Sequence, residues 1–324
     1  MKYFFVARLH GLTINQVLNR GIRVLENLRV TNNKSIIESR SDDFFKTMLG
    51  KLEYNSLLQG PFVYAEGDYE DDSENVENGR LEFLNYYLRL CQTVGTSLWL
   101  TKDNSVRTEL GFLYVYDKKL LTIQSVSSNM RTTQFVDCKG GNEDTVFSVE
   151  EINDSIKLYT DIFGENTNAD LDHYETSKII TMEANRLERF VYFLQSTRTQ
   201  GFPPGRIAMY CMLLETLLST SKAEIGHQLA ERTALLLGKG IEEREKIYKF
   251  IKDAYSVRSA NFHGDKLPRK YRSIEKQTEL CIEFDNYIRR LFKIIFTNSE
   301  ITNRYKSNDE NTELNKWFNE LIFS

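Results

Sequence analysis

The chain reads Ile207-Ala-Met-Tyr-Cys-Met-Leu-Leu-Glu-Thr-Leu-Leu218 through a segment whose one charged residue is Glu215. A surface helix carries a polar face, whereas a helix that is apolar on all sides is buried. A carboxylate inside such a helix needs a cationic or hydrogen-bonding partner, because an unpaired buried charge is costly. We therefore expect a central buried helix over these residues, in which Glu215 is buried and paired.

Further helices are predicted on both sides of this segment. Apolar residues recur at helical spacing over residues 182–199, 222–237, 241–263, 273–296 and 310–323. Gly238 and Gly264 are the expected stops of two of these helices, since glycine is common just beyond a helix end. Short loops between such helices make them antiparallel neighbours, which indicates a helical bundle.

The first half of the chain has a mixed pattern. Residues 2–9, 97–100, 110–116 and 120–125 predict strands, the last two as a hairpin. A helix is expected over residues 81–94, and the capping box Ser148-Val-Glu-Glu151 predicts another that runs to about residue 163. The expected fold class is therefore α+β, with antiparallel strands in a mixed amino-terminal domain and an all-α bundle after it.

A run rich in glycine, asparagine and aspartate over residues 163–176 predicts the boundary between the two domains. The amino-terminal α+β domain then covers residues 1–170, and the helical domain covers residues 175–324. The chain length of 324 residues also fits two domains better than one or three.

Composition narrows the classes of function. The net charge is −4, so a nucleic-acid site would have to be a local basic patch on an acidic protein. No apolar run reaches the length of a membrane span. The apolar stretch among the first residues is too short for a signal peptide, and a charged residue follows it too soon. The four cysteines form no CxxC pair, which favours the reducing cytoplasm and leaves zinc and redox sites unsupported. We expect no membrane contact, no metal and no cofactor.

The acidic residues 65–79 could in principle bind a metal ion. Their spacing fits no EF-hand loop, and runs of charge are usually solvated, so we expect a solvated segment.

Two arginines interrupt apolar helical stripes. Arg232 and Arg258 stand at positions where the preceding turns place isoleucine, leucine and alanine. Arginine is almost never fully buried without a partner. One interpretation is a structural ion pair of Glu215 with either arginine. The other is that Arg258 lines a polar cleft and faces a phosphate, which suits a planar guanidinium.

A histidine follows Arg258 at the end of the same predicted helix. His263 is five residues further on, roughly 140° around an ideal helix. Gly264 comes directly after it, so we expect the last turn to let the histidine swing toward the arginine. Tyr255 and Asn261 each lie three residues from Arg258, close enough to contact it.

Four blocks of the helical part, in this order, resemble the Apea-like HEPN family: Leu213-Leu-Glu-Thr-Leu-Leu218, Ile225-Gly-His-Gln-Leu-Ala-Glu-Arg-Thr-Ala-Leu-Leu-Leu-Gly238, Glu243-Arg-Glu-Lys-Ile-Tyr248 and Tyr255-Ser-Val-Arg-Ser-Ala-Asn-Phe-His-Gly264. The resemblance implies a helical bundle that dimerises and is, in many members, a metal-independent ribonuclease. Arg258 and His263 would then be the catalytic pair. Ser259 stands where catalytic members often have Asn, Asp or His, and looks usual for the Apea-like branch.

The leading hypothesis is an endoribonuclease that acts as a defence or toxin-like effector. The 2′-hydroxyl of RNA is an internal nucleophile, histidine suits the proton transfers, and a fixed arginine stabilises the charge that develops on phosphorus oxygens. Each chain supplies one such histidine, so the mechanism implies a homodimer. The amino-terminal domain would sense a trigger, bind a regulatory partner or restrain the site.

Two alternatives remain. One is a non-catalytic dimer that binds RNA or a protein partner, and the other is an antitoxin-like partner of a nucleotidyltransferase. Among the other histidines, His227 is expected to support the site or lie at the surface, because its helix also carries Glu224 and Glu231. His10 and His173 are interpreted as incidental.

Overall fold

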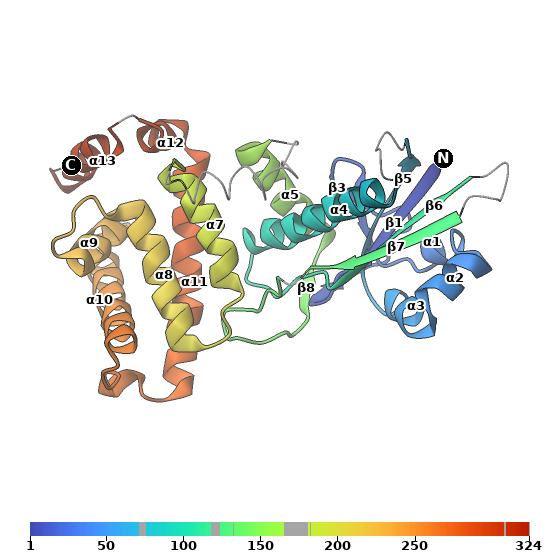
Figure 1. Cartoon of the computed structure of the whole chain (residues 1–324). Helices are drawn as coiled ribbons and strands as arrows, with labels where there is room; N and C mark the ends of the chain where they lie inside the picture. Colours follow the sequence, from blue (N-terminus) through green and yellow to red (C-terminus); the bar gives the residue numbers. More distant parts are fainter. Residues whose placement is uncertain are drawn as a thin grey trace. The chain divides into compact units, whose positions relative to one another are not determined.

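The computed structural model describes residues 1–70, 76–117, 124–131, 133–164, 181, 183–307 and 309–323. Within these residues the chain forms two compact units, which Figure 1 shows coloured along the sequence. One comprises residues 1–135 and 142–169, and the other comprises residues 136–141 and 170–324, wherever these are described. The first unit combines a sheet with helices and the second is helical, so the predicted α+β class is confirmed.

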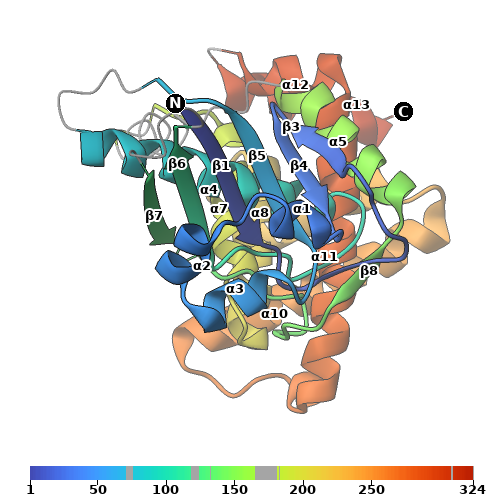
Figure 2. The ribbon, with the colours of Figure 1, turned by 90° about the vertical axis from the view of Figure 1, so that its right-hand side faces the viewer.

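A six-stranded antiparallel sheet forms the first unit, with the order β3-β4-β5-β1-β6-β7 that can be followed in Figure 2. The central strand β1 pairs with β5 and β6, so that Phe5 lies opposite both Ala65 and Leu113. A separate parallel pair joins β2 to β8. The strands are β1 (Lys2–Arg8), β2 (Leu12–Ile14), β3 (Ile22–Leu25), β4 (Leu28–Thr31), β5 (Phe62–Asp68), β6 (Leu110–Tyr116), β7 (Gln124–Met130) and β8 (Thr145–Phe147).

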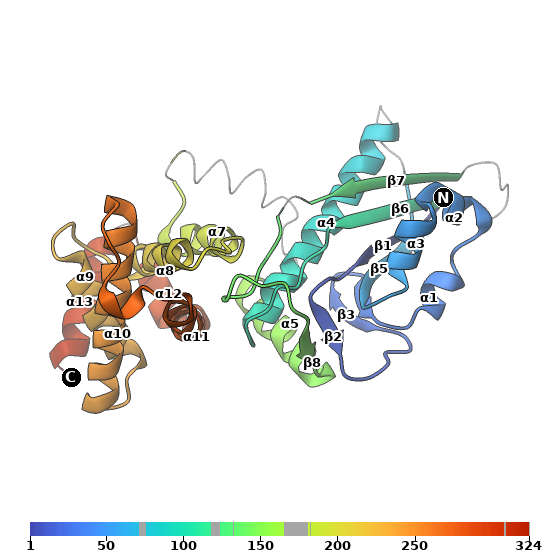
Figure 3. The same cartoon turned by 90° about the horizontal axis from the view of Figure 1, so that it is seen from below.

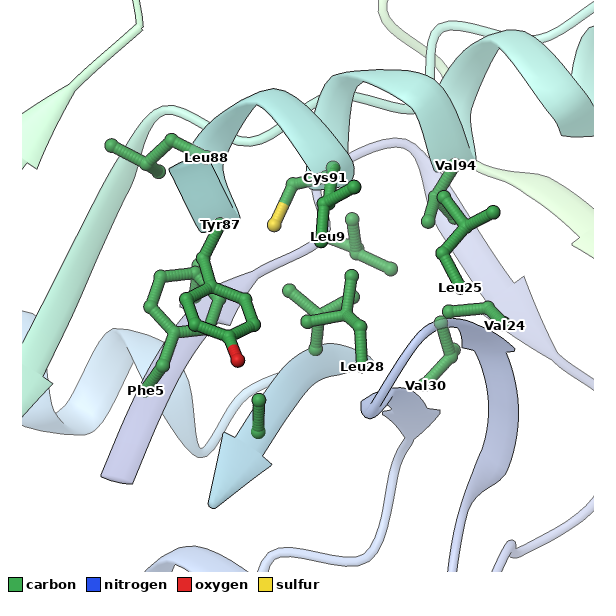
Figure 4. Close-up of a cluster of buried hydrophobic side chains, with 14 of the residues drawn as sticks. Phe5, Leu9, Val24, Leu25, Leu28, Val30, Tyr87, Leu88, Cys91 and Val94 are labelled. Atoms are coloured by element: carbon green, nitrogen blue, oxygen red, sulfur yellow. The ribbon is translucent and has the colours of Figure 1, made fainter. Parts of the chain in front are cut away.

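Helices cover both faces of this sheet, as Figure 3 shows. Phe5 and alternate residues of β1 pack toward α4 (Val76–Trp99) and α5 (Val149–Phe163). In Figure 4, Tyr87, Leu88, Cys91 and Val94 of α4 lie over Phe5, Leu9 and Leu28. Phe4 and Val6 pack on the other face, toward α1 (Ser35–Glu38), α2 (Asp43–Leu49) and α3 (Lys51–Leu57). Because β1 is buried on both faces, its sequence is continuously apolar instead of alternating.

The strand prediction for residues 97–100 is wrong. Helix α4 continues through Trp99, and the hydroxyls of Thr96 and Ser97 donate to backbone carbonyls four residues earlier, at 3.2 and 2.9 Å. Back-bonding of this kind satisfies the hydroxyl donor of a serine or threonine inside a helix. The predictions for residues 2–9 and 110–116 are confirmed by β1 and β6. Of the strand predicted over residues 120–125, residues 120–123 lie outside the described residues and the rest begins β7.

The capping box at the start of α5 is confirmed. The Glu151 backbone N–H donates to Ser148 Oγ at 3.1 Å, and the Ser148 N–H donates to Glu151 Oε2 at 2.9 Å. These two bonds satisfy backbone donors that the first turn of a helix would otherwise leave unpaired.

Helix α8 (Pro203–Leu218) is the central helix of the second unit. It packs against α7 (Arg186–Arg198), α10 (Ile241–His263) and α11 (Ile274–Thr297), while α9 (Ile225–Leu237) packs mainly on α10. Ile207, Tyr210 and Leu214 of α8 are fully buried, so the predicted central helix is confirmed. The remaining helices of this unit, within its described residues, are η1 (Arg269–Tyr271), α12 (Ser299–Tyr305) and α13 (Glu310–Phe323); η1 and α12 were not predicted.

A short segment from before α5 belongs to the second unit. The Val136 N–H donates to the carbonyl of Arg198 at 2.9 Å. Gly140, with a φ of +84°, lies so close to Gly201 that a Cβ would stand 2.2 Å from the Gly201 carbonyl oxygen. The sequence did not predict that residues 136–141 join this unit, and the boundary predicted at residues 163–176 is described only as far as Gly164.

All four cysteines are buried thiols. In the part of the chain that the structure describes, no helix is both long enough and apolar enough to span a membrane.

Candidate functional site

Helix α10 carries both residues of the Arg-x4-His motif near its carboxyl end. It runs through His263, and Gly264 then takes a left-handed conformation with a φ of 74°, which glycine adopts without steric cost. The N–H groups of Gly264 and Asp265 both point to the carbonyl of Ala260, at 2.9 Å for Asp265. His263 is therefore the last helical residue, and its side chain is exposed.

The side chain of Arg258 extends from α10 toward α8. Its Nη2 is 3.3 Å from Oε1 of Glu215, and the two side chains are 28% and 25% exposed. The guanidinium carbon is 5.2 Å from the ring centroids of both Tyr255 and Phe262, within the range of cation–π contact. The arginine is thus held by one carboxylate and two rings, yet part of it stays open to solvent and can meet a ligand.

His263 does not contact Arg258 within a single chain. Among the described residues, the ion-pair partner of Arg258 is Glu215 and its cation–π partners are Tyr255 and Phe262. Because α10 remains a regular helix up to Gly264, the five-residue spacing keeps the two side chains roughly 140° apart. The expected swing of the histidine toward the arginine is therefore not present in this structure.

The pairing of Glu215 with Arg258 agrees with one of the two sequence-based alternatives, but complete burial of Glu215 is wrong. A quarter of the side chain reaches the α8 surface, although Oε1 itself is covered and accepts no hydrogen bond of good geometry. Burial raises the pKa of the Glu215 carboxyl, and Arg258 offsets part of that rise. The ion pair with Arg258 therefore compensates only part of the cost of burying this carboxylate.

Arg232 does not pair with Glu215. Its Nη1 donates to the carbonyl of Leu218 at the end of α8, its Nη2 donates to Asn315 at 3.2 Å, and its guanidinium carbon lies 4.3 Å from the Phe318 ring. Burial lowers the pKa of this arginine. It fastens α13 and the end of α8 to α9, which is a structural role away from the motif.

The residues predicted to support Arg258 divide into two groups. Tyr255 contacts it and packs against α9, where a Cβ on Gly226 would stand 2.8 Å from the tyrosine ring. Asn261 is exposed and Ser259 is partly buried, and neither side chain is among the ion-pair and cation–π partners of Arg258 in the described part of the chain. Phe262 takes that place instead. The sequence signal for it was available, because residues four apart lie side by side on a helix.

His227 lies at the surface and connects α9 to α10. Its Nδ1 is 2.9 Å from the Tyr248 hydroxyl, and its Nε2 is 3.8 Å from Glu231. This agrees with the predicted surface role. His173 lies outside the described residues.

A basic segment directly after the motif was missed by the sequence analysis. Residues 265–272 hold four basic side chains and one acidic side chain, Asp265. The segment is anchored on α10 by Asp253, which accepts hydrogen bonds from Tyr271 at 2.7 Å and from Lys270 at 2.8 Å. It supplies the local basic patch that a nucleic-acid site on this acidic protein requires. Its exposed members are Lys266, Arg269, Lys270 and Arg272.

The described residues contain no group of three or more histidine, cysteine, aspartate or glutamate side chains placed to hold a metal ion. Of the acidic residues 65–79, residues 71–75 lie outside the described part.

The raised pKa of Glu215 gives a test by pH. A carboxyl whose pKa is raised by folding contributes stability that is complete below its ordinary range and is lost as pH rises through the folded pKa. Glu215→Gln removes this effect, so the variant should gain stability relative to wild type between about pH 4 and about pH 7.5. Urea denaturation at both pH values measures it. Glu242→Gln, at an exposed position, is the control. The expectation is contradicted if the difference in unfolding free energy between Glu215→Gln and wild type is the same at both pH values.

Comparisons of the chain with protein-family models, with curated proteins and with solved structures give no match. The HEPN resemblance therefore depends on the four sequence blocks alone.

Proposed function

We propose that the helical unit is a metal-independent endoribonuclease of the HEPN type. The observation that carries the proposal is Arg258, a partly exposed guanidinium at the end of α10, followed by the exposed His263 and then by the basic segment of residues 265–272. A guanidinium, an imidazole and neighbouring cations can together promote cleavage of an RNA phosphodiester by its own 2′-hydroxyl.

Each group has a distinct role in this chemistry. The 2′-oxygen attacks phosphorus and the 5′-oxygen leaves, so one proton must be removed and another supplied. His263 performs one of these transfers, since imidazole titrates near neutral pH. Arg258 binds the nonbridging oxygens and stabilises the charge that grows on them. The basic segment holds the flanking phosphates.

The missing Arg–His contact favours a site shared by two chains. In one chain the two side chains lie on different sides of α10, so a single copy does not bring both to one phosphate. Two copies related by a twofold axis would supply two arginines and two histidines to one groove. Phe262, 66% exposed between them, is an apolar side chain that such an interface would cover. We therefore include a homodimer in the proposal, to be tested by light scattering.

Glu215 restrains the site in this proposal. Its carboxylate lies against the part of Arg258 that a phosphate would take, and its Oε1 accepts no hydrogen bond in the described part of the chain. RNA binding must displace it, because one guanidinium face cannot bind both anions.

A second candidate function is a dimer that binds RNA or a protein partner without cleaving it. Two observations favour it: Arg258 is already paired, and Ser259 replaces the polar residue common after the arginine in catalytic members. Incubation of the purified chain with RNA in EDTA separates the candidates. Cleavage supports the nuclease, and tight binding without cleavage supports the binding module. Co-purification of a second chain supports the antitoxin-like alternative.

We assign the activity to the cytoplasm, as a defence or toxin-like effector. Expression of the wild type should then slow growth, and His263→Ala should relieve that effect.

Removal of the restraint should strengthen RNA binding. Glu215→Gln keeps the size of the side chain and abolishes its charge. The probe is 2′-O-methyl RNA, which cannot be cleaved. Its affinity should rise about two- to fivefold, because a partly exposed ion pair is worth ~0–1 kcal/mol. Fluorescence anisotropy measures the affinity. Glu242→Gln makes the same change of charge at an exposed site, and an equal rise there would mean that the gain is general electrostatics.

A further inference from the structure

A polar cavity of about 410 Å³ opens beside the end of β1, entirely within the first unit. It is lined by residues from five separate parts of the chain, among them Arg8, His10, Arg107, Asn142 and Asp144. Small-molecule sites usually occupy cavities of roughly 300–1,000 Å³, in which a few polar groups converge. The volume is therefore that of a site for a mononucleotide or a molecule of similar size.

The backbone holds the floor of the cavity in place. His10 and Arg107 form a two-way pair of backbone hydrogen bonds, at 2.9 and 3.1 Å. Gly11 then turns the chain with a φ of +75°, and a Cβ there would stand 2.7 Å from Ser105 Oγ. Because only glycine fits this close to Ser105, the wall of the cavity is formed by a sterically defined turn at Gly11.

Two arginines line this cavity, and each has a buried guanidinium nitrogen that has no hydrogen-bond partner in the described part of the chain. Arg107 is 11% exposed, and its Nη2 donates to Glu109 at 2.8 Å, while Nε and Nη1 are buried without a hydrogen-bond partner in the described part of the chain. Arg8 donates through Nη1 to Ser56 at 3.1 Å, and its Nε is likewise buried without a partner. Buried donors without acceptors are costly, so an anion that accepts from them gains affinity.

The remaining groups fit the rest of such a ligand. His10 is partly buried, which lowers its pKa, with Glu109 opposing and both arginines adding to that effect. Asp144 is exposed at the rim, where it accepts a hydrogen bond from Thr13 at 3.3 Å, and Asn142 lies two residues before it. A carboxylate and an amide at the rim are acceptors for sugar hydroxyls, while the cations lie deeper.

We infer that this cavity binds a phosphorylated small molecule of mononucleotide size, with the phosphate on Arg8 and Arg107 and hydroxyl groups on Asp144 and Asn142. The unpartnered nitrogens of both arginines are covered in this structure, so this binding mode requires both guanidinium groups to turn toward the cavity. The group that the cavity recognises is a sugar esterified with phosphate. Two kinds of ligand carry this group, a nucleotide and a simple sugar phosphate. This site is separate from the Arg-x4-His motif, and its test does not depend on RNA cleavage.

Calorimetric titration of the full chain tests the assignment with adenosine 5′-monophosphate, ribose 5-phosphate and adenosine. We expect the nucleotide to bind and adenosine to bind at least about tenfold more weakly, because it lacks the phosphate. Binding of ribose 5-phosphate as tight as that of the nucleotide identifies a sugar phosphate as sufficient. If the nucleotide binds and ribose 5-phosphate does not, the ligand is a nucleotide.

Variants place the ligand in this cavity. Arg8→Gln and Arg107→Gln should each weaken binding of the nucleotide about tenfold or more. Asn142→Asp adds a negative charge at an exposed position, so it should also weaken nucleotide binding without affecting folding. This variant still tests whether the nucleotide binds in the cavity if an arginine variant unfolds. Arg20→Gln, outside the cavity, is the control. The assignment is overturned if neither phosphorylated probe binds at millimolar concentration, if adenosine binds as tightly as the nucleotide, or if Asn142→Asp leaves binding unchanged.

Discussion

His263→Ala is expected to abolish RNA cleavage while folding and dimerisation stay intact. The imidazole is exposed at the last position of α10 and has no structural contact in the described part of the chain, so its removal leaves no cavity and breaks no ion pair. Acid–base catalysis by one side chain typically contributes roughly 10²–10⁴-fold in rate, so the cleavage rate should fall by that factor. A gel assay with end-labelled RNA measures it.

Arg258→Ala should cause a comparable loss for another reason, because it removes the cation that binds the phosphate. Arg258→Lys is the informative companion variant. It keeps the charge but loses the planar, two-pronged donor, so it should stay well below wild type. His227→Ala, which removes a surface histidine of α9, should cleave at the wild-type rate.

The chemistry of the products separates this mechanism from metal-assisted hydrolysis. Attack by the 2′-hydroxyl leaves a 2′,3′-cyclic phosphate and a 5′-hydroxyl, and EDTA should not slow the reaction. Cleavage that persists in His263→Ala, or that requires Mg²⁺, would show that the motif does not carry the activity, and the binding module would take its place.

The sequence predicted the core of the helical unit because that part is governed by local periodicity. The apolar run around Tyr210 predicted a buried helix, and its lone carboxylate required a cationic or hydrogen-bonding partner. The choice between the two candidate arginines could not be made from spacing. Arg232 finds its partners at Asn315 and Phe318, more than eighty positions further along the chain, and no local pattern announces such contacts.

The first unit was harder to predict for a similar reason. Several of its strands are three or four residues long, too short for an alternating pattern to stand out, and their pairing is between distant segments. The cavity at the end of β1 shows the same limit. His10, an isolated histidine in the sequence, meets Arg107 only through a backbone bridge across the fold.

Another ion pair of the helical unit was missed because its spacing resembles that of an ordinary surface pair. Asp285 and Arg289 lie four residues apart on α11, with a distance of 2.8 Å between Oδ2 and Nη1, but their side chains are 1% and 12% exposed. Asp285 Oδ1 also accepts a hydrogen bond from the Tyr210 hydroxyl of α8 at 2.8 Å. That hydroxyl in turn accepts from Arg206 Nε at 2.9 Å. The network therefore joins the central helix to α11 inside the core.

Asp285→Ala should destabilise the chain strongly. Removal of one partner of a buried pair leaves the other charge uncompensated, which costs about 3–5 kcal/mol. For a unit of this size the melting temperature should fall by roughly 10 °C. Asp285→Asn keeps an oxygen that can accept from Tyr210 and should lose less. Thermal melting followed by circular dichroism measures all three proteins.

The matched comparison is with the ion pair between Glu215 and Arg258. Both pairs join an acidic residue to an arginine of the same helical unit, and they differ in exposure, because about a quarter of each side chain of the second pair reaches solvent. Loss of a partly exposed pair costs only ~0–1 kcal/mol, so Glu215→Gln should melt within a few degrees of wild type. Equal destabilisation by Asp285→Ala and Glu215→Gln would contradict this distinction. A large effect of the first and a small effect of the second would show that the fold depends on Asp285, which leaves Arg258 free to exchange its carboxylate for a phosphate.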